Sequence, residues 1–253
     1  MIIRRMALFI RKHDWSAVVV EVVVVIVGLM LAFQLDGWVE QRGERKQETE
    51  YIERLISDLE DDIPAIQYAI DLASLRLRLV NLLMDVSSDP AVATARPVEF
   101  LGAVSQAAFT YTPSLTSHTF EDLRSTGNIR LLLSQEIRDA LYEYYGFDTN
   151  QRQFRPLQFS TEHRHFELAA GVLSHEQEIF VQDNWRIFIP GEIDNIENVP
   201  PDINQVGEAA QRLHESPELV AWLPQVRALQ IEQIGTHRAR LERANSVLDV
   251  LQQ

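Results

Sequence analysis

Hydrophobic and polar positions divide the chain into one uninterrupted apolar stretch and a long periodic remainder. The apolar stretch runs from Ala17 to Leu35 over nineteen residues, and only Glu21 and Gln34 break it. As an α-helix it would be about 28 Å long, close to the roughly 30 Å hydrocarbon core of a bilayer. The pattern therefore predicts a transmembrane helix over residues 16–38.

The periodic part begins with a seam of apolar residues at alternating spacings of four and three. This spacing predicts a long helix from about residue 48 to residue 86, with Pro64 on its outer surface. Further apolar residues widen the stripe beyond that of a two-stranded coiled coil, so the helix is expected to pack inside a bundle. The seam consists of Ile52, Ile56, Leu59, Ile63, Ile66, Ile70, Ala73, Leu77, Val80 and Met84.

Shorter helices are expected to follow, and a loop is expected at residues 91–96 between the long helix and the next one. Ser134 is a candidate N-cap, and the run from Ser174 to Gln177 fits a capping box. A final helix from 217 to 251 has the length to pack against the long one. The predicted fold class is all-α: an N-terminal transmembrane helix continues into a long helix, and residues 39–253 form an antiparallel helical bundle.

Residues 1–15 form a basic leader in front of the apolar stretch. Apolar residues fall on one helical arc, and Arg4, Arg5, Arg11 and Lys12 fall on the opposite one. This pattern predicts an amphipathic helix at the cytoplasmic interface of the bilayer, with the basic side chains near lipid phosphates. The alternative is a disordered positive tail. Trp38, at the other end of the stretch, fits an interfacial anchor.

The apolar stretch has one face of small residues with an acid among them. Gly28 and Ala32 form a small-xxx-small pair, which allows close approach of another helix backbone, and an intramembrane Glu usually faces a partner. The expected partners are therefore other transmembrane helices, in a homo-oligomer or a larger membrane complex. The alternative for Glu21 is snorkelling to the nearby boundary. The face consists of Ala17, Glu21, Val24, Gly28, Ala32 and Leu35.

The charge distribution bears on partners and orientation. Residues 1–35 hold four of the 23 basic and two of the 37 acidic side chains, so the remainder has 19 and 35, a formal charge of −16. Such a negative domain disfavours nucleic-acid binding. Four basic residues precede the span and three follow closely, which favours a cytoplasmic N-terminus and a periplasmic bundle at a bacterial inner membrane. The chain has no cysteine, which excludes disulfides and thiol chemistry.

Candidate chemistry is sparse, and the sequence predicts neither an enzyme nor a cofactor or metal site. His163 and His165 lie about 200° apart on a helix and cannot share an ion. His237 falls on the seam of the last helix, where a hydrogen-bonded core histidine is expected. The pair Asp61 and Asp62 is expected to be solvated. Two roles remain: a structural or accessory membrane subunit, or a sensing module with a pocket near Tyr142, Tyr144, Tyr145, Phe154 and Phe166.

Three segments resemble a family of bacterial single-pass membrane proteins of unknown function. They are Ala32 to Trp38, which reads AFQLDGW, Phe120 to Asn128, which reads FEDLRSTGN, and Leu141 to Tyr145. The resemblance implies an N-terminal anchor ending in a Gln-Leu-Asp-x-Trp-like motif and a helical remainder. It brings no activity, catalytic residue or cofactor.

Overall fold

The computed structural model of the protein describes residues 15–192 and 203–253, and within these ranges every regular element is a helix. The all-α prediction is confirmed. The chain divides into two compact units, residues 1–53 and 54–253, and each is described separately below. Helix α2 (Trp15–Ser88) supplies residues to both, so the predicted continuation of the apolar helix into a long helix is also confirmed.

In the first unit, the described side chains of the apolar stretch are exposed. Val24 is 64% exposed and Phe33 is 72% exposed, although both are strongly hydrophobic. Within the described residues, this is the one helix long and apolar enough to cross a membrane. The predicted leader, residues 1–15, lies outside the described residues except for Trp15.

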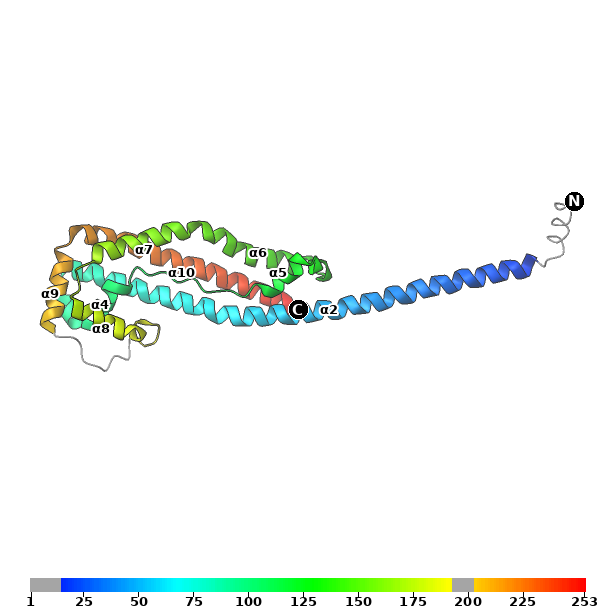
Figure 1. Ribbon diagram of the computed structural model, residues 1–253, viewed down its shortest axis with the longest axis horizontal. Coiled ribbons are helices and arrows are strands. Elements are labelled where there is room, and N and C mark those ends of the chain that lie inside the picture. The colour runs from blue at the N-terminus through cyan, green and yellow to red at the C-terminus, as the bar shows by residue number, and fades with distance from the viewer. Residues whose placement is uncertain (1–14, 193–202) are drawn as a thin grey trace. The chain divides into compact units, whose positions relative to one another are not determined.

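The second unit is a helical bundle in which residues 54–88 of α2 run beside three other long helical segments (Figure 1). Tyr144 joins α6 to α2 through a 2.8 Å hydrogen bond to Asp62, and Arg227 joins α10 to α2 through a 3.0 Å hydrogen bond to Asn81. The last helix therefore packs against the long helix, as predicted. The three segments are α6 (Gln135–Gln151), α7 (Arg155–Ala169) and α10 (Pro217–Leu251).

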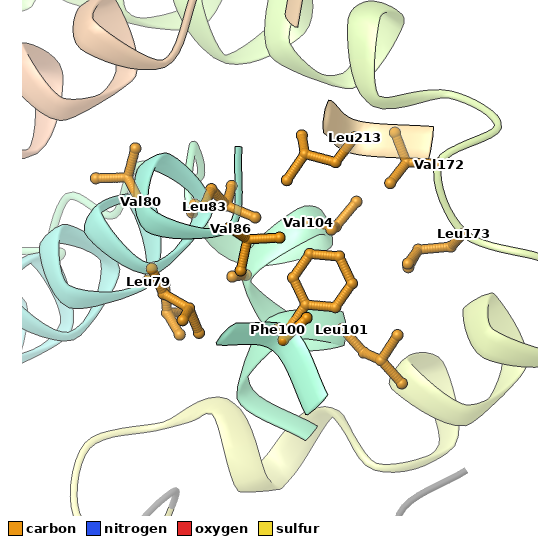
Figure 2. Packing of buried hydrophobic residues seen from close by; sticks show 14 of the residues in the cluster. Leu79, Val80, Leu83, Val86, Phe100, Leu101, Val104, Val172, Leu173 and Leu213 are labelled. Carbon is orange, nitrogen blue, oxygen red and sulfur yellow. The ribbon is translucent and has the colours of Figure 1, made fainter. Parts of the chain in front are cut away.

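Shorter helices close one end of this bundle. Apolar side chains from α2, α4, α9 and the segment before α8 meet there, as Figure 2 shows around Val86, Phe100 and Leu213. Residues 91–95, predicted as a loop, are helical, because the turn after Pro90 buries Ala93 in this cluster. The short elements at this end are α3 (Ala91–Ala95), α4 (Pro97–Gln106), α8 (His175–Asp183), η3 (Trp185–Phe188) and α9 (Ile203–His214). Elsewhere in the bundle are α5 (His118–Ser125), η1 (Asn128–Leu131) and η2 (Arg152–Phe154).

The predicted helix starts are confirmed by their hydrogen bonds. The Ser134 hydroxyl accepts from the amide of Ile137 at 3.3 Å. Ser174 and Gln177 form the reciprocal capping box at the start of α8, with distances of 2.8 and 3.3 Å. These caps satisfy amides that the helix cannot pair internally, and so they fix where α6 and α8 begin.

The buried stripe of α2 in the bundle is rotated from the predicted seam. Leu59, Ile66 and Val80 are buried as expected, whereas Ile56 and Ile63 are only half-buried. Leu55 is buried, in agreement with the prediction that further apolar residues widen the stripe, and Asp62, Ala69 and Leu83, which lie outside the predicted seam, are buried too. The stripe is wide because α2 packs against both α6 and α10. Pro64 is exposed, as predicted.

Candidate functional site

The predicted membrane face lies on a regular part of α2. At about 100° per residue, Glu21, Val24, Ala32 and Leu35 fall within roughly 40° of Gly28 around the helix. All five positions are exposed. The side chain of Ala17 lies outside the described ones. The helix thus presents the small and acidic residues together, and their role in contacting another helix stays a prediction.

Gly28 is open on this face. A Cβ atom built there would meet no atom within 4 Å. A glycine with no neighbour among the described residues leaves room for another backbone to approach closely.

Of the residues predicted to lie at the membrane interfaces, the structure describes only Trp38, at the C-terminal end of the predicted span. Trp38 is 58% exposed, and the guanidinium of Arg42 lies 5.4 Å from the centre of its ring. An exposed indole beside a cation suits the headgroup region of a bilayer. The basic residues at the other end lie outside the described residues; these are Arg4, Arg5, Arg11 and Lys12.

The bundle contains a buried carboxylate that the sequence pattern did not reveal. Asp62 is 1% exposed, which contradicts its predicted solvation. Its Oδ1 accepts from the amide of Thr116 at 2.8 Å, and its Oδ2 accepts from the hydroxyl of Tyr144 at 2.8 Å. Burial raises the pKa of the Asp62 carboxyl, while these hydrogen bonds oppose the rise. The adjacent Asp61 is exposed.

The tyrosines beside Asp62 act as neutral donors. The hydroxyl of Tyr145 donates to the carbonyl of Thr116 at 3.2 Å. Burial, together with the charge of Asp62, raises the pKa of Tyr144, and burial with the charge of Asp58 raises that of Tyr145. Both hydroxyls therefore stay protonated. That of Tyr144 holds α6 to α2, and that of Tyr145 holds α6 to the segment before α5.

A second buried polar cluster links α10 to α6. Arg240 is 2% exposed; it donates to Asp148 at 2.9 Å and to Nδ1 of His237 at 2.7 Å. Nε2 of His237 then donates to the carbonyl of Tyr111 at 3.0 Å. Burial, with Arg240 beside it, lowers the pKa of His237 to about 4. The expectation of a hydrogen-bonded core histidine is confirmed.

The structure also places His163 and His165, the two histidines that the sequence predicted could not share a metal ion. The ring of His165 is fully buried, and Nε2 donates to the carbonyl of Val104 at 3.1 Å. Burial lowers its pKa, so the ring is neutral. His163 is exposed and lies near Glu167. Within the described residues no three His, Asp or Glu side chains are placed to hold a metal ion.

A cavity of about 420 Å³ opens next to the Asp62 cluster. Tyr142, Tyr144 and Tyr145 line it, as the sequence suggested. Phe154 does not; it is 43% exposed elsewhere. The remaining lining comes from the segment before α5 and from α5, α6, η2 and α7: Pro113, Ser114, Leu115, Ser117, Phe120, Glu121, Arg124, Gly146, Asp148, Thr149, Arg152 and Arg155.

Phe166 lines a different cavity of about 520 Å³. Its walls are mainly apolar, with Phe109, Leu173 and Trp185 among them. The five aromatic residues that the sequence grouped together therefore serve two separate cavities and an exposed surface.

The residues that sequence reasoning missed are polar ones whose partners are distant along the chain. Asp62 pairs with Tyr144 across 82 positions, and Asp148 pairs with Arg240 across 92. One signal was available: Asp62 falls four positions from Ile66, on the edge of the apolar stripe, where a solvated acid is not expected.

Comparison with known proteins found no family model that matches this chain, and no match among curated proteins or solved structures. The resemblance to a family of bacterial single-pass membrane proteins stays a prediction.

Proposed function

We propose that this protein is a non-catalytic structural or accessory subunit of a membrane protein assembly, anchored by one transmembrane helix. The observation that carries the proposal is the exposed face of α2 around Gly28. An apolar helix without protein cover is stable in a bilayer, where each backbone group is paired within the helix. The small residues on this face favour a second helix over lipid as its neighbour.

Glu21 strengthens the proposal because an acid is costly inside a membrane. A carboxyl among lipid chains costs about 2.5 kcal/mol or more near the helix centre, and a partner that accepts its proton or donates to it reduces the cost. Glu21 lies seven positions before Gly28 and points to the same side.

We place the assembly in a bacterial inner membrane, with the N-terminus in the cytoplasm and the bundle in the periplasm. The four basic residues before the span, against three just after it, favour this orientation. A reporter fused after Gln253 and active only in the cytoplasm gives no signal if the orientation is right. A strong signal would reverse it.

The main test is extraction of the native membrane with mild detergent, followed by native mass measurement. We expect a homo-oligomer or a co-purifying membrane protein. Glu21→Leu should shift the mass toward the single chain, whereas Glu40→Leu, beyond the predicted span on the same helix, should leave the assembly intact. A single chain in the unaltered protein would refute the subunit proposal, and an unchanged assembly in Glu21→Leu would leave snorkelling as the role of that acid.

A second candidate function is a ligand-binding module, and the cavity beside Asp62 favours it. Its volume of about 420 Å³ lies within the range of small-molecule sites, about 300–1,000 Å³. A buried hydrogen-bond network holds two of its tyrosines in place. Binding of a small molecule to the full chain, with assembly unaffected, would favour this candidate over the first.

A further inference from the structure

The cavity beside Asp62 has a positive lining in an acidic protein. Three arginines and two acids line it, whereas the whole chain has a formal charge of −14. The charge of Asp148 is already balanced by two arginines. Its Oδ1 accepts from buried Arg240 at 2.9 Å, and its Oδ2 lies 3.4 Å from Arg152. Glu121 is the one lining acid without an arginine partner, and it accepts from the hydroxyl of Ser117 at 3.0 Å.

Two lining arginines are available for a ligand. Arg124 on α5 and Arg155 at the start of α7 form no hydrogen bond or ion pair with the described residues, and both are exposed. A guanidinium binds a planar carboxylate through two parallel hydrogen bonds, which gives orientation as well as attraction. Arginines on two different helices, both on one cavity, suit a single anionic group.

The rest of the wall supplies aromatic carbon. The rings of Phe120 and Tyr145 are stacked, with centroids 4.4 Å apart and planes at 7°, and Tyr142 meets Phe120 edge-on at 5.4 Å. The hydroxyl of Tyr145 already donates to the carbonyl of Thr116, so this residue offers its ring rather than a polar group. A flat ring fits against such a wall by stacking or edge contact.

We infer that this cavity binds a small aromatic carboxylate, whose carboxylate pairs with Arg124 and Arg155 and whose ring packs against Phe120, Tyr142 and Tyr145. The inference rests on the second function proposed above and adds the chemical class of the ligand. The charge of the two arginines selects the carboxylate of the ligand, and the aromatic wall of the cavity selects its flat ring.

The test is calorimetric titration of the full chain in detergent with three probes: naphthoate, its neutral amide, and cyclohexanecarboxylate, which carries the charge without an aromatic ring. We expect naphthoate to bind at least tenfold more tightly than either of the other two. Arg124→Gln and Arg155→Gln should each weaken naphthoate by about tenfold or more, the usual effect of losing a charged hydrogen bond.

The matched control is Arg130→Gln, on the neighbouring element η1, because Arg130 is exposed and does not line the cavity. It should bind naphthoate as the unaltered chain does. Arg124 and Arg155 form no hydrogen bond or ion pair with the described residues, so their variants should also unfold at the same denaturant concentration as the unaltered chain. That measurement separates lost binding from lost folding.

Two results would overturn the inference in different ways. Equal binding of naphthoate and its amide would reject the anionic class and leave the binding module in place. Failure of all three probes to bind would reject the aromatic carboxylate as the ligand class, whereas the binding-module function would fail only if no small molecule of any class bound the full chain.

Discussion

Two stretches of helix α2 distribute their hydrophobic and polar residues in opposite ways. Residues 19–35 are almost wholly apolar, and every one of their side chains is exposed. Residues 54–88 contain many charged side chains, and one of these, Asp62, is buried, with 1% of it exposed. One continuous helix thus exposes its most hydrophobic surface and buries an ionisable group.

The difference teaches that burial in this protein follows the available partner rather than hydrophobicity. Asp62 is buried because Thr116 and Tyr144 offer two donors at 2.8 Å, which offset much of the cost of removing a carboxylate from water. The valines of the apolar stretch have no such neighbours among the described residues of the chain. Their surroundings are expected to be lipid and another helix.

The largest effect is expected where a buried charge loses its partners. Arg240→Met removes the hydrogen bonds to Asp148 and His237, and leaves the Asp148 carboxylate with only the exposed Arg152, 3.4 Å from its Oδ2. Breaking a buried ion pair from one side costs about 3–5 kcal/mol. We expect the free energy of unfolding to fall by that amount in urea denaturation of the full chain in detergent.

A matched control is available two positions away. Arg238 lies on the same helix but is exposed, so Arg238→Met should change the free energy of unfolding by less than about 0.5 kcal/mol. Equal losses in the two variants would show that the Arg240 cluster does not stabilise the bundle.

His237 predicts a pH dependence with a definite sign. Its folded pKa of about 4 lies below the ordinary value of 6.5, because burial and Arg240 disfavour the charged ring. The unfolded chain therefore binds the proton first, and stability that is fully present above pH 6.5 is lost as the pH falls toward 4. Relative to His237→Gln, the unaltered chain should lose about 2–3 kcal/mol of unfolding free energy across this window.

The comparison with His237→Gln is needed because Asp62 acts in the opposite direction. Its raised folded pKa means that its protonation on acidification favours the folded state. Asp62 is present in both proteins, so its contribution cancels in the difference. A difference that stays constant between pH 7 and pH 4 would show that His237 titrates normally.

Much of the fold could be predicted from sequence because its signals are local. The nineteen apolar residues, the heptad-like spacing, and the caps at Ser134 and Ser174 each determine structure within one or two helical turns. The rotation of the seam was not predictable in this way. It depends on α6 and α10 both packing against α2, and so on contacts between distant segments.

The polar sites could be predicted only in part, for the same reason. The sequence placed Tyr142, Tyr144 and Tyr145 near a pocket because they lie close together on one helix. It gave no indication that Arg124 and Arg155 would meet them, or that Asp62 would be buried by a tyrosine 82 positions away. His237 was predictable because it falls on an apolar seam.

A smaller effect is expected at a glycine that the bundle uses for close packing. A Cβ on Gly102 would lie 2.0 Å from the ring of Phe188. Gly102→Ala should therefore push the ring out of the core, with a loss of about 1–3 kcal/mol in unfolding free energy. Gly235→Ala, where a Cβ meets no atom within 4 Å, should stabilise α10 by about 0.5–1 kcal/mol. Similar effects at the two positions would argue against the packing of Phe188 on Gly102.

Substitution of Gly28 tests the apolar stretch of α2. We expect it to affect the assembly of the protein with another helix and not the folding of the bundle. A Cβ on Gly28 would also meet no atom within 4 Å, so Gly28→Leu should leave the unfolding of the bundle unchanged. If another helix packs on this face, the bulk of leucine would separate the two backbones and weaken assembly by about 1 kcal/mol, roughly fivefold. Gly43→Leu is the matched control, since Gly43 lies on the same helix beyond the predicted span and is equally open. Weaker assembly in Gly28→Leu alone would show that the exposed stretch has a protein partner. Equal assembly in the two variants, measured by native mass in detergent, would leave lipid as its only neighbour.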